Sequence, residues 1–347
     1  MEPPIGTSET NYIAIYPPHK KKTLSMNIQD LLSKANSGDA ASCYELTLYY
    51  TNNGDIANAR VYLQKSLQLG YPRAFYDTGV ILKDQKQPEG LKFLQRAAEM
   101  KYAPAMMTLG DMFREGDGVA VDKAQALRYY EQCATYGSAE NKIGVAITLV
   151  ETGMVNKDYY GNIDKWLKSA KDEMDRELRR NYSVPTFKKF AELTAFAGNV
   201  YKTMAKKCSG LFNSKQKDDY LDKAYEFFKI GDPTFAAMMA LEDEVAGVSK
   251  LEALICLRCA KLYFPEKFAN AKNWIQAYFS HLEKKCNLSS FIISEALNTL
   301  IGSIDIAPGE SIDDIMLNLA CDFGSEFIEE LSSSEIIAIA KKWDIYS

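Results

Sequence analysis

An internal period of 31 to 37 residues restricts the fold of this chain more than any other feature. The residue that precedes each predicted helix pair recurs at this spacing; these residues are Gly38, Gly70, Lys101 and Gly137. Aromatic residues of the second predicted helix recur in the same frame; they are Tyr62, Phe93, Tyr129 and Trp166. A small residue comes four positions after each aromatic; these are Ser66, Ala97, Cys133 and Ala170. Such a period is typical of stacked helix pairs, because one pair cannot bury its apolar face alone.

Small residues and turn formers occupy fixed places in this frame. Two small residues five positions apart recur in the first predicted helix: Ala74 with Gly79, and Ala105 with Gly110. We expect them to let two helices approach closely, with the aromatic of the second helix filling the gap between neighbouring repeats. Gly70 and Gly137 are predicted to end the preceding helices with positive φ. Pro72 and Pro104 are predicted to lie in the first turns of new helices.

The segment 101–137 carries the most complete copy of the frame. The residues that match are Ala105, Leu109, Gly110, Phe113, Gly116, Gly118, Val119, Asp122, Ala126, Tyr129, Tyr130, Cys133, Ala134 and Gly137. In this pattern the segment resembles a Sel1-like repeat, the α/α relative of the tetratricopeptide repeat. Units 38–70 and 70–101 match in part, with Thr47 in place of the second glycine in the first of them. The resemblance implies an all-α fold, an α/α superhelical solenoid of helix pairs.

Three regions follow from the extent of the repeats. Residues 1–26 contain four prolines and are predicted to form a flexible leader. Residues 27–180 are predicted to form Sel1-like repeats. Beyond residue 180 the frame decays, so residues 181–347 are predicted to form degenerate helical repeats or a C-terminal helical domain. In that part Asp232 and Pro233 predict a helix start, and Asn287 predicts another.

Charge and hydropathy exclude several classes of partner. The net charge of −5 argues against nucleic acid, because binding to phosphates needs a basic surface. The chain has no run of 18 apolar residues and no apolar segment at its start, so we expect neither membrane insertion nor a cleavable signal peptide. Seven cysteines without regular spacing predict free, mostly buried thiols. We therefore expect a cytoplasmic protein, or one secreted into a host cell cytosol without a cleavable signal peptide.

Residues with catalytic or metal-binding chemistry are sparse. Two histidines, His19 and His281, are too few for a serine triad, a Cys-His dyad or a histidine-rich metal site. Cys256 and Cys259 form a CxxC without the second ligand pair of a zinc site or the strand of a redox site, so we expect core packing. The loop glycines 116 and 118 lack the lysine and hydroxyl of a phosphate loop. The sequence therefore predicts no catalytic residues, no metal site and no cofactor.

The residues predicted to bind a partner lie on the first helix of each pair, which the resemblance places on a concave surface. They are offset from the small packing residues and are Glu45, Asp77, Thr108, Asp111, Arg114, Glu140 and Glu151. Most of them are acidic. We therefore expect a face of negative potential that binds another protein through a basic or helical segment.

Stacked repeats without catalytic groups favour a protein-interaction scaffold or adaptor. The resemblance and the decay of the repeats suggest a narrower hypothesis, a bacterial effector or a regulator or inhibitor of one. The acidic segment 326–335 loosely resembles the tail signal of secreted effectors, and an amphipathic end helix is the alternative interpretation. The alternative function is an enzyme built on a helical solenoid with a carboxylate-based site, which would require carboxylates converging in a deep pocket.

Overall fold

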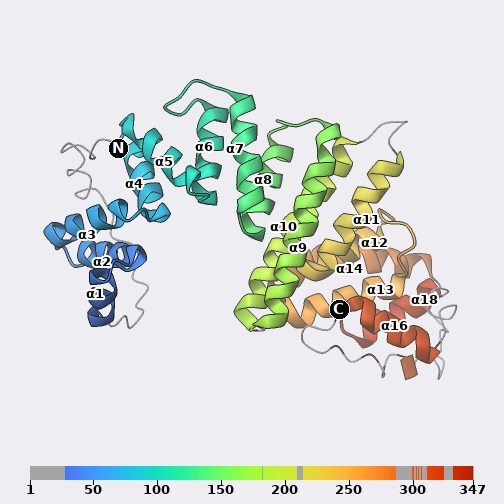
Figure 1. Cartoon of the computed structure of the whole chain (residues 1–347). Helices are drawn as coiled ribbons and strands as arrows, with labels where there is room; N and C mark the ends of the chain where they lie inside the picture. The colour runs from blue at the N-terminus through green and yellow to red at the C-terminus, as the bar shows by residue number, and fades with distance from the viewer. Residues whose placement is uncertain are drawn as a thin grey trace. The chain divides into compact units, whose positions relative to one another are not determined.

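The computed structural model describes residues 28–181, 183–208, 214–286, 299–300, 302, 304, 306, 311–323 and 331–346. Within these ranges every regular element is a helix, so the predicted all-α fold is confirmed (Figure 1). The predicted leader, residues 1–26, and the predicted helix start at Asn287 lie outside the described residues. None of the described helices is both long and apolar enough to cross a bilayer.

The chain divides into two compact units, residues 1–145 and 146–347, and each is described by itself. This division marks where contacts become sparse, whereas the predicted boundary at 180/181 marks where the repeat frame decays; the latter stays a prediction. The helices of unit 1 are α1 (Ile28–Asn36), α2 (Ala40–Asn52), α3 (Ile56–Gln68), α4 (Pro72–Asp84), α5 (Glu89–Glu99), α6 (Ala103–Glu115) and α7 (Lys123–Tyr136). Helix α8 (Ala139–Glu151) spans the division.

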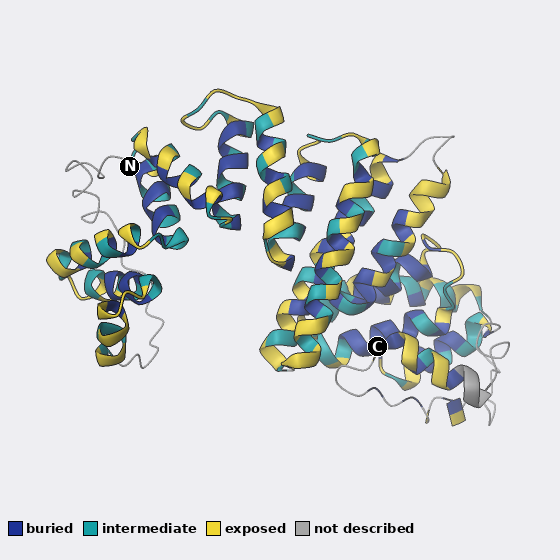
Figure 2. Ribbon diagram, in the orientation of Figure 1, coloured by how far each residue is buried: buried dark blue, intermediate teal, exposed yellow. Residues whose placement is uncertain are grey.

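Unit 1 is built from consecutive helix pairs, as the period predicts. Helix α2 packs on α3, α4 on α5, and α6 on α7 (Figure 1). Buried residues lie on the sides where paired helices meet, and exposed residues lie on the opposite sides (Figure 2). The pairs also contact their neighbours, because Tyr44 of α2, Leu63 of α3 and Ala74 of α4 belong to one buried cluster.

The chain turns before three of the pairs through residues in the left-handed conformation. Gly38, Gly70 and Lys101 have φ values of 94°, 77° and 62°. The prediction of positive φ is thus confirmed for Gly70 but wrong for Gly137, whose φ is −85°. Gly137 is restricted by space instead: a Cβ there would lie 2.5 Å from the carbonyl oxygen of Cys133. The first-turn prolines of α4 and α6 occur where the sequence predicts them.

Small residues permit close contact between the two helices of a pair. A Cβ at Gly79 would lie 2.8 Å from Leu94 Cγ, and a Cβ at Gly110 would lie 2.6 Å from Tyr130 Cε1. The filling residue therefore comes one position after the aromatic that the sequence singles out. The buried residues at this position are Leu63, Leu94, Tyr130 and Leu167. One step along a helix rotates a side chain by roughly 100°. The residue after each recurring aromatic therefore points toward the partner helix, and the aromatic itself points to a different side.

The recurring aromatics instead contact an aromatic of the preceding helix in their own pair. The ring centroids lie 5.5 Å apart for Tyr50 and Tyr62, 6.0 Å for Phe75 and Phe93, and 5.7 Å for Phe113 and Tyr129. These rings therefore stabilise the contact within each pair. Tyr62 also packs against a buried cluster that contains Ala35 of α1, in the preceding repeat, which agrees with the expectation that these aromatics fill the gap between neighbouring repeats.

The described helices of unit 2 vary more in length than those of unit 1, from 9 to 24 residues. They are α9 (Tyr160–Arg180), α10 (Val184–Lys207), α11 (Ser214–Gly231), α12 (Pro233–Leu241), α13 (Lys250–Tyr263), α14 (Pro265–Lys285), α16 (Ile312–Phe323) and α18 (Ser333–Lys342), with the 3-10 turn η2 (Lys157–Tyr159) before them. Helices α10 and α11 meet as the pairs of unit 1 do, because a Cβ at Gly198 would lie 3.0 Å from Phe228 Cε1. The predicted start of α12 is confirmed, with Asp232 as N-cap. Residues 326–330 of the acidic tail segment lie outside the described residues.

Candidate functional site

The residues predicted to bind a partner lie on the first helices of unit 1 and on α8. They are Glu45 on α2, Asp77 on α4, Thr108, Asp111 and Arg114 on α6, and Glu140 and Glu151 on α8. The two residues on α8 are exposed and the others are half-buried. The structure brings Asp111 and Arg114 into an ion pair, whereas the predicted acidic residues lie on four different helices. Whether they form one binding surface stays a prediction.

Asp111 has a structural role that the sequence does not reveal. The buried Tyr130 hydroxyl donates a hydrogen bond to Asp111 Oδ1 at 2.7 Å. Arg114 Nε donates to the same hydroxyl at 3.0 Å, and Arg114 Nη2 donates to Asp111 Oδ1 at 3.1 Å. Burial, and then the hydrogen bond to Asp111, raise the pKa of Tyr130. This carboxylate therefore fixes the ring that packs on Gly110, and reversing its charge would disturb the fold.

Asp77 holds neighbouring repeats together in a similar way. The buried hydroxyl of Tyr44 on α2 donates a hydrogen bond to Asp77 Oδ2 on α4. Arg73 Nε lies 3.5 Å from the same oxygen, and the Arg73 guanidinium lies 5.3 Å from the centroid of the Tyr44 ring. Two of the acidic residues predicted to face a partner are thus already occupied by tyrosine and arginine side chains of unit 1.

Unit 2 repeats the contact between a buried tyrosine and a carboxylate. The Tyr201 hydroxyl donates to Asp164 Oδ1 at 3.0 Å, and the Tyr225 hydroxyl donates to Glu252 Oε1 at 2.8 Å. Burial raises the pKa of both phenols, so they stay protonated donors at neutral pH. Carboxylates opposite buried tyrosines in this chain are therefore structural partners of those rings.

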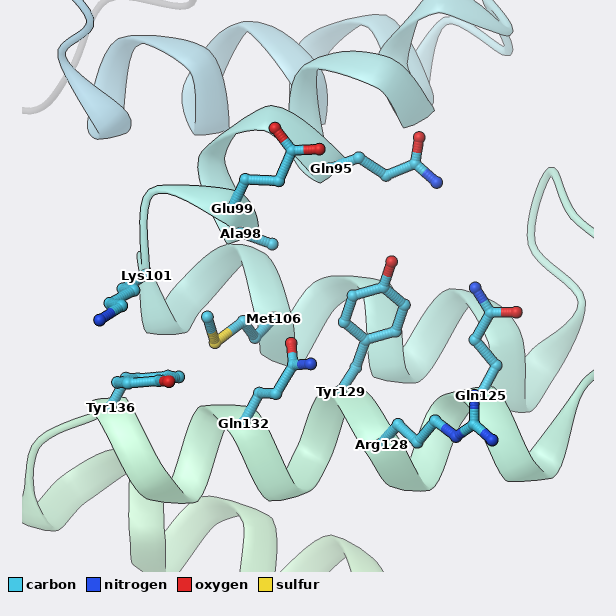
Figure 3. Close-up of a pocket in the computed structure, with 10 residues that line it drawn as sticks. All are labelled: Gln95, Ala98, Glu99, Lys101, Met106, Gln125, Arg128, Tyr129, Gln132 and Tyr136. Carbon is cyan, nitrogen blue, oxygen red and sulfur yellow. The ribbon is translucent and has the colours of Figure 1, made fainter.

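A groove in unit 1 lies between second helices of adjacent pairs, where the sequence analysis places no site. It has a volume of about 640 Å³ (Figure 3). The lining residues come from α5, α6, α7 and the α5–α6 turn; they are Gln95, Ala98, Glu99, Lys101, Met106, Gln125, Arg128, Tyr129, Gln132 and Tyr136. Side chains of α5 and α7 point toward one another across the groove (Figure 3).

The groove is rich in hydrogen-bonding side chains that the fold does not use. Among the hydrogen bonds and ion pairs of the described residues, none involves the side chain of Gln95, Gln125, Gln132 or Arg128. Each glutamine amide offers two donors and one acceptor, and the guanidinium offers five donors. The groove can therefore bind a ligand through several hydrogen bonds without breaking an internal one.

The two charged residues at one end of the groove are already engaged. Lys101 Nζ lies 4.8 Å from the centroid of the Tyr136 ring, and Glu99 forms an ion pair with Arg96 at 3.0 Å. A sequence signal for the groove exists along α7. The lining residues of α7 follow the spacing of one helix face; they are Gln125, Arg128, Tyr129, Gln132 and Tyr136. This face lies on a second helix, whereas the residues predicted to bind a partner lie on first helices.

A second pocket, of about 610 Å³, lies in unit 2 around the buried Lys229 of α11. Lys229 Nζ lies 2.9 Å from Glu226 Oε1, 3.6 Å from Glu252 Oε1 and 2.5 Å from Asp313 Oδ1. Burial lowers the pKa of Lys229, but the hydrogen bonds to Asp313 and Glu226 outweigh burial and raise it. The amine therefore stays a charged ion-pair partner, which makes it a poor nucleophile at neutral pH.

The remaining residues of chemical interest are placed as follows. His281 is exposed on α14, and Cys256 and Cys259 are buried in α13, which confirms the expected core packing of the CxxC. Burial raises the pKa of the Cys256 thiol, which makes thiolate chemistry there less favourable. Five of the six described cysteines are buried free thiols, as predicted, and the Cys321 side chain lies outside the described residues. In the described part of the chain, no three metal-ligating side chains gather.

Comparison with known proteins yields similar solved structures, of which two are described. No family model matches the sequence, and no curated protein matches it. A protective antigen of uropathogenic Escherichia coli with an SLR fold is 17% identical, covers 92% of this chain and 70% of its own, and has a TM-score of 0.34. A Sel1 repeat protein from Oxalobacter formigenes is 15% identical, covers 64% of this chain and 86% of its own, and has a TM-score of 0.37. The chain is thus similar to two Sel1-repeat (SLR) proteins, and its repeated helix pairs and the frame of residues 101–137 resemble that family independently.

Proposed function

We propose that this chain is a protein-interaction scaffold that binds a segment of a partner protein in the groove between α5 and α7. The observation that supports this most directly is the set of four polar side chains that line the groove and take part in no described hydrogen bond or ion pair. Polar groups that converge on a cleft and lack partners are typical of binding sites.

Position-specific photocrosslinking tests this proposal. A photoreactive amino acid in place of the exposed Gln132, inside the groove, is compared with one in place of the exposed Lys92, on α5 outside it. In lysate of the source or host cell, we expect protein adducts from position 132 that are absent from position 92. Equal labelling at the two positions would contradict a binding site in the groove.

The first-helix residues form a second proposed surface within the same function. We propose that the acidic residues Glu45, Glu140 and Glu151 meet a basic or helical segment of the partner. A role as a bacterial effector, or as a regulator of one, is the narrower form of the proposal. A translocation reporter fused to residues 1–347 tests it, and failure to enter host cells would remove the effector role.

An enzyme is the second candidate function, and the pocket of unit 2 is the observation that favours it. Carboxylates of Glu226, Glu252 and Asp313 converge there on Lys229. Native mass spectrometry after incubation with a metabolite extract tests this candidate. A small molecule that binds the parent chain and is lost in Lys229→Met, but retained in a groove variant such as Gln132→Ala, would support it; the absence of any bound molecule would count against it.

A further inference from the structure

We propose that the groove between α5 and α7 takes a proline-rich segment in the polyproline II conformation, with acidic residues beside it. This inference rests on the proposed function and names the class of its ligand. It draws on the length of the groove, the spacing of its tyrosines, its unused hydrogen-bond donors and its charge, each of which is derived from the lining residues.

The spacing of two tyrosines on α7 matches the length of one polyproline II turn. Tyr129 and Tyr136 are seven residues apart on α7, which places them about 10 Å apart along the helix axis. One turn of polyproline II spans three residues and about 9 Å. The two rings can therefore contact successive turns of the ligand on its same side. From Gln125 to Tyr136 the face is about 16 Å long, which accommodates about five residues of such a segment.

The exposure and the fixed orientation of the Tyr129 and Tyr136 rings agree with contact to a polyproline II segment. Tyr136 is 50% exposed, and its ring is held by the Lys101 ammonium. Tyr129 is half-buried and stacked on Phe113, so its ring is fixed by the helix pair itself. Figure 3 shows Tyr129 rising from α7 toward α5, between Gln132 and Gln125. Fixed aromatic faces bind prolines at a low cost in conformational entropy.

The hydrogen-bond donors of the groove suit the backbone of a polyproline II segment. Polyproline II has no internal hydrogen bonds, so its carbonyl groups need donors from outside. The amides of Gln95, Gln125 and Gln132 supply such donors along both walls of the groove. A helical ligand satisfies its own backbone and needs an apolar groove, and a strand needs the open edge of a sheet. The polar lining between two helices fits neither of these as well as it fits polyproline II.

The charge of the groove indicates the flanking residues of the ligand. Lys101 and Arg128 are cationic, whereas the one acidic lining residue, Glu99, is paired with Arg96 outside the groove. A ligand with acidic flanks is therefore favoured over one with basic flanks. The chain's own Pro17 and Pro18 are followed at once by His19 and three lysines, which have the wrong sign. This proline pair is therefore not the expected occupant, and the inference commits to a segment of a partner.

Fluorescence anisotropy with the full chain tests the inference. The probes are labelled peptides of eight consecutive prolines flanked by two glutamates or by two lysines, and a glycine–serine peptide with the two glutamates. We expect the acidic proline peptide to bind about tenfold more tightly than the other two. Gln132→Ala and Tyr129→Phe should each weaken it by about two- to tenfold, because each removes a group that donates hydrogen bonds. Gln85→Ala, outside the groove, is the matched neutral control and should leave binding unchanged.

Arg128→Glu adds a test of charge, since it should reverse the preference between acidic and basic flanks without loss of the fold, the residue being exposed. Equal binding of the glycine–serine peptide, or binding that is insensitive to Gln132→Ala, would overturn the inference. So would an affinity that rises about tenfold in Pro17→Ala/Pro18→Ala, because the leader would then be the occupant. Crosslinked partners at position 132 combined with no binding of proline peptides would refute the ligand class and leave the proposed function standing.

Discussion

At the scale of single residues, space between helices decides which positions tolerate change. Gly110 lies so close to Tyr130 that a methyl group would overlap the ring, and the ring is fixed by its hydrogen bond to Asp111. Gly144, in the middle of α8, has nothing within 4 Å of the position of a Cβ. The two helical glycines therefore have different roles: Gly110 permits the close contact with Tyr130, and Gly144 borders unfilled space.

Replacing each glycine by alanine separates these roles. Gly110→Ala should lower the free energy of unfolding by about 1–3 kcal/mol, because the ring or the helix must shift. Gly144→Ala should instead raise it by about 0.5–1 kcal/mol, since alanine favours helix and meets no clash. Thermal or urea denaturation monitored by circular dichroism measures both. No loss of stability in Gly110→Ala would refute the close contact there, and a loss in Gly144→Ala would refute the open space at that position.

At the scale of elements, polar contacts attach helices that the repeat frame does not specify. Helix α18 begins with a capping box, in which Ser332 accepts a hydrogen bond from the Glu335 amide and Glu335 accepts one from the Ser332 amide. It is tied to α14 by an ion pair of Lys341 Nζ with Glu283 Oε1 at 2.5 Å. The Tyr346 hydroxyl, just beyond α18, donates to the same carboxylate oxygen at 2.9 Å. Glu283 therefore links the end of the chain to α14.

The carboxylate of Glu283 should make this attachment sensitive to acid. The hydrogen bond from Lys341 lowers the pKa of Glu283 below its ordinary value of 4.5, and the bond from Tyr346 adds to this effect. A lowered pKa in the folded state means that the stabilisation is present above pH 4.5 and is lost as the pH falls through the folded value. We expect Glu283→Gln to lower the Tm at pH 7, and we expect this difference from the parent to shrink as the pH falls below 4.5. A difference that stays constant throughout acid titration would show that charge plays no part.

Much of the architecture could be predicted from the sequence, because it depends on local signals. The spacing of Gly38, Gly70 and Lys101 marks the turns, and the prolines mark helix starts. The facing of side chains between helices was harder to predict. The choice between Tyr129 and Tyr130 depends on a single step of rotation, and the structural role of Asp111 depends on a ring of the next helix.

The groove shows the same limit at the level of the site. Its lining on α7 is visible as a helical stripe, but Gln95 and Glu99 come from another pair, and the sequence does not say that α5 and α7 face each other. The helical period was sufficient to select seven polar residues on the first helices as candidates. Whether they bind a partner stays a prediction. Long-range neighbours could not be inferred from the period alone.

At the scale of the whole molecule, two compact units each contain their own close glycine contacts and their own tyrosine–carboxylate bonds. In unit 1 Tyr130 bonds Asp111, and in unit 2 Tyr225 bonds Glu252. The described contacts of these two pairs share no partner. Stability in chains of stacked repeats is approximately a sum of local terms, so the two units should respond to substitutions separately.

A double substitution tests this expectation. Tyr130→Phe and Tyr225→Phe each leave a half-buried carboxylate with one hydrogen bond fewer, at a cost of about 1–2 kcal/mol. The loss in the double variant should equal the sum of the single losses to within about 0.5 kcal/mol. Chemical denaturation followed by fluorescence measures the three values. A coupling larger than this would show that the two bonds are energetically linked.

The turn before α6 differs from its equivalents in one respect that affects evolution of the chain. Where Gly38 and Gly70 adopt the left-handed conformation freely, Lys101 adopts it at a cost of about 1 kcal/mol. The same lysine covers the Tyr136 ring at the end of the groove. A glycine at this position would relax the backbone and at the same time remove a cation from the binding face. Selection for stability would therefore favour glycine at position 101, whereas selection for recognition would favour lysine.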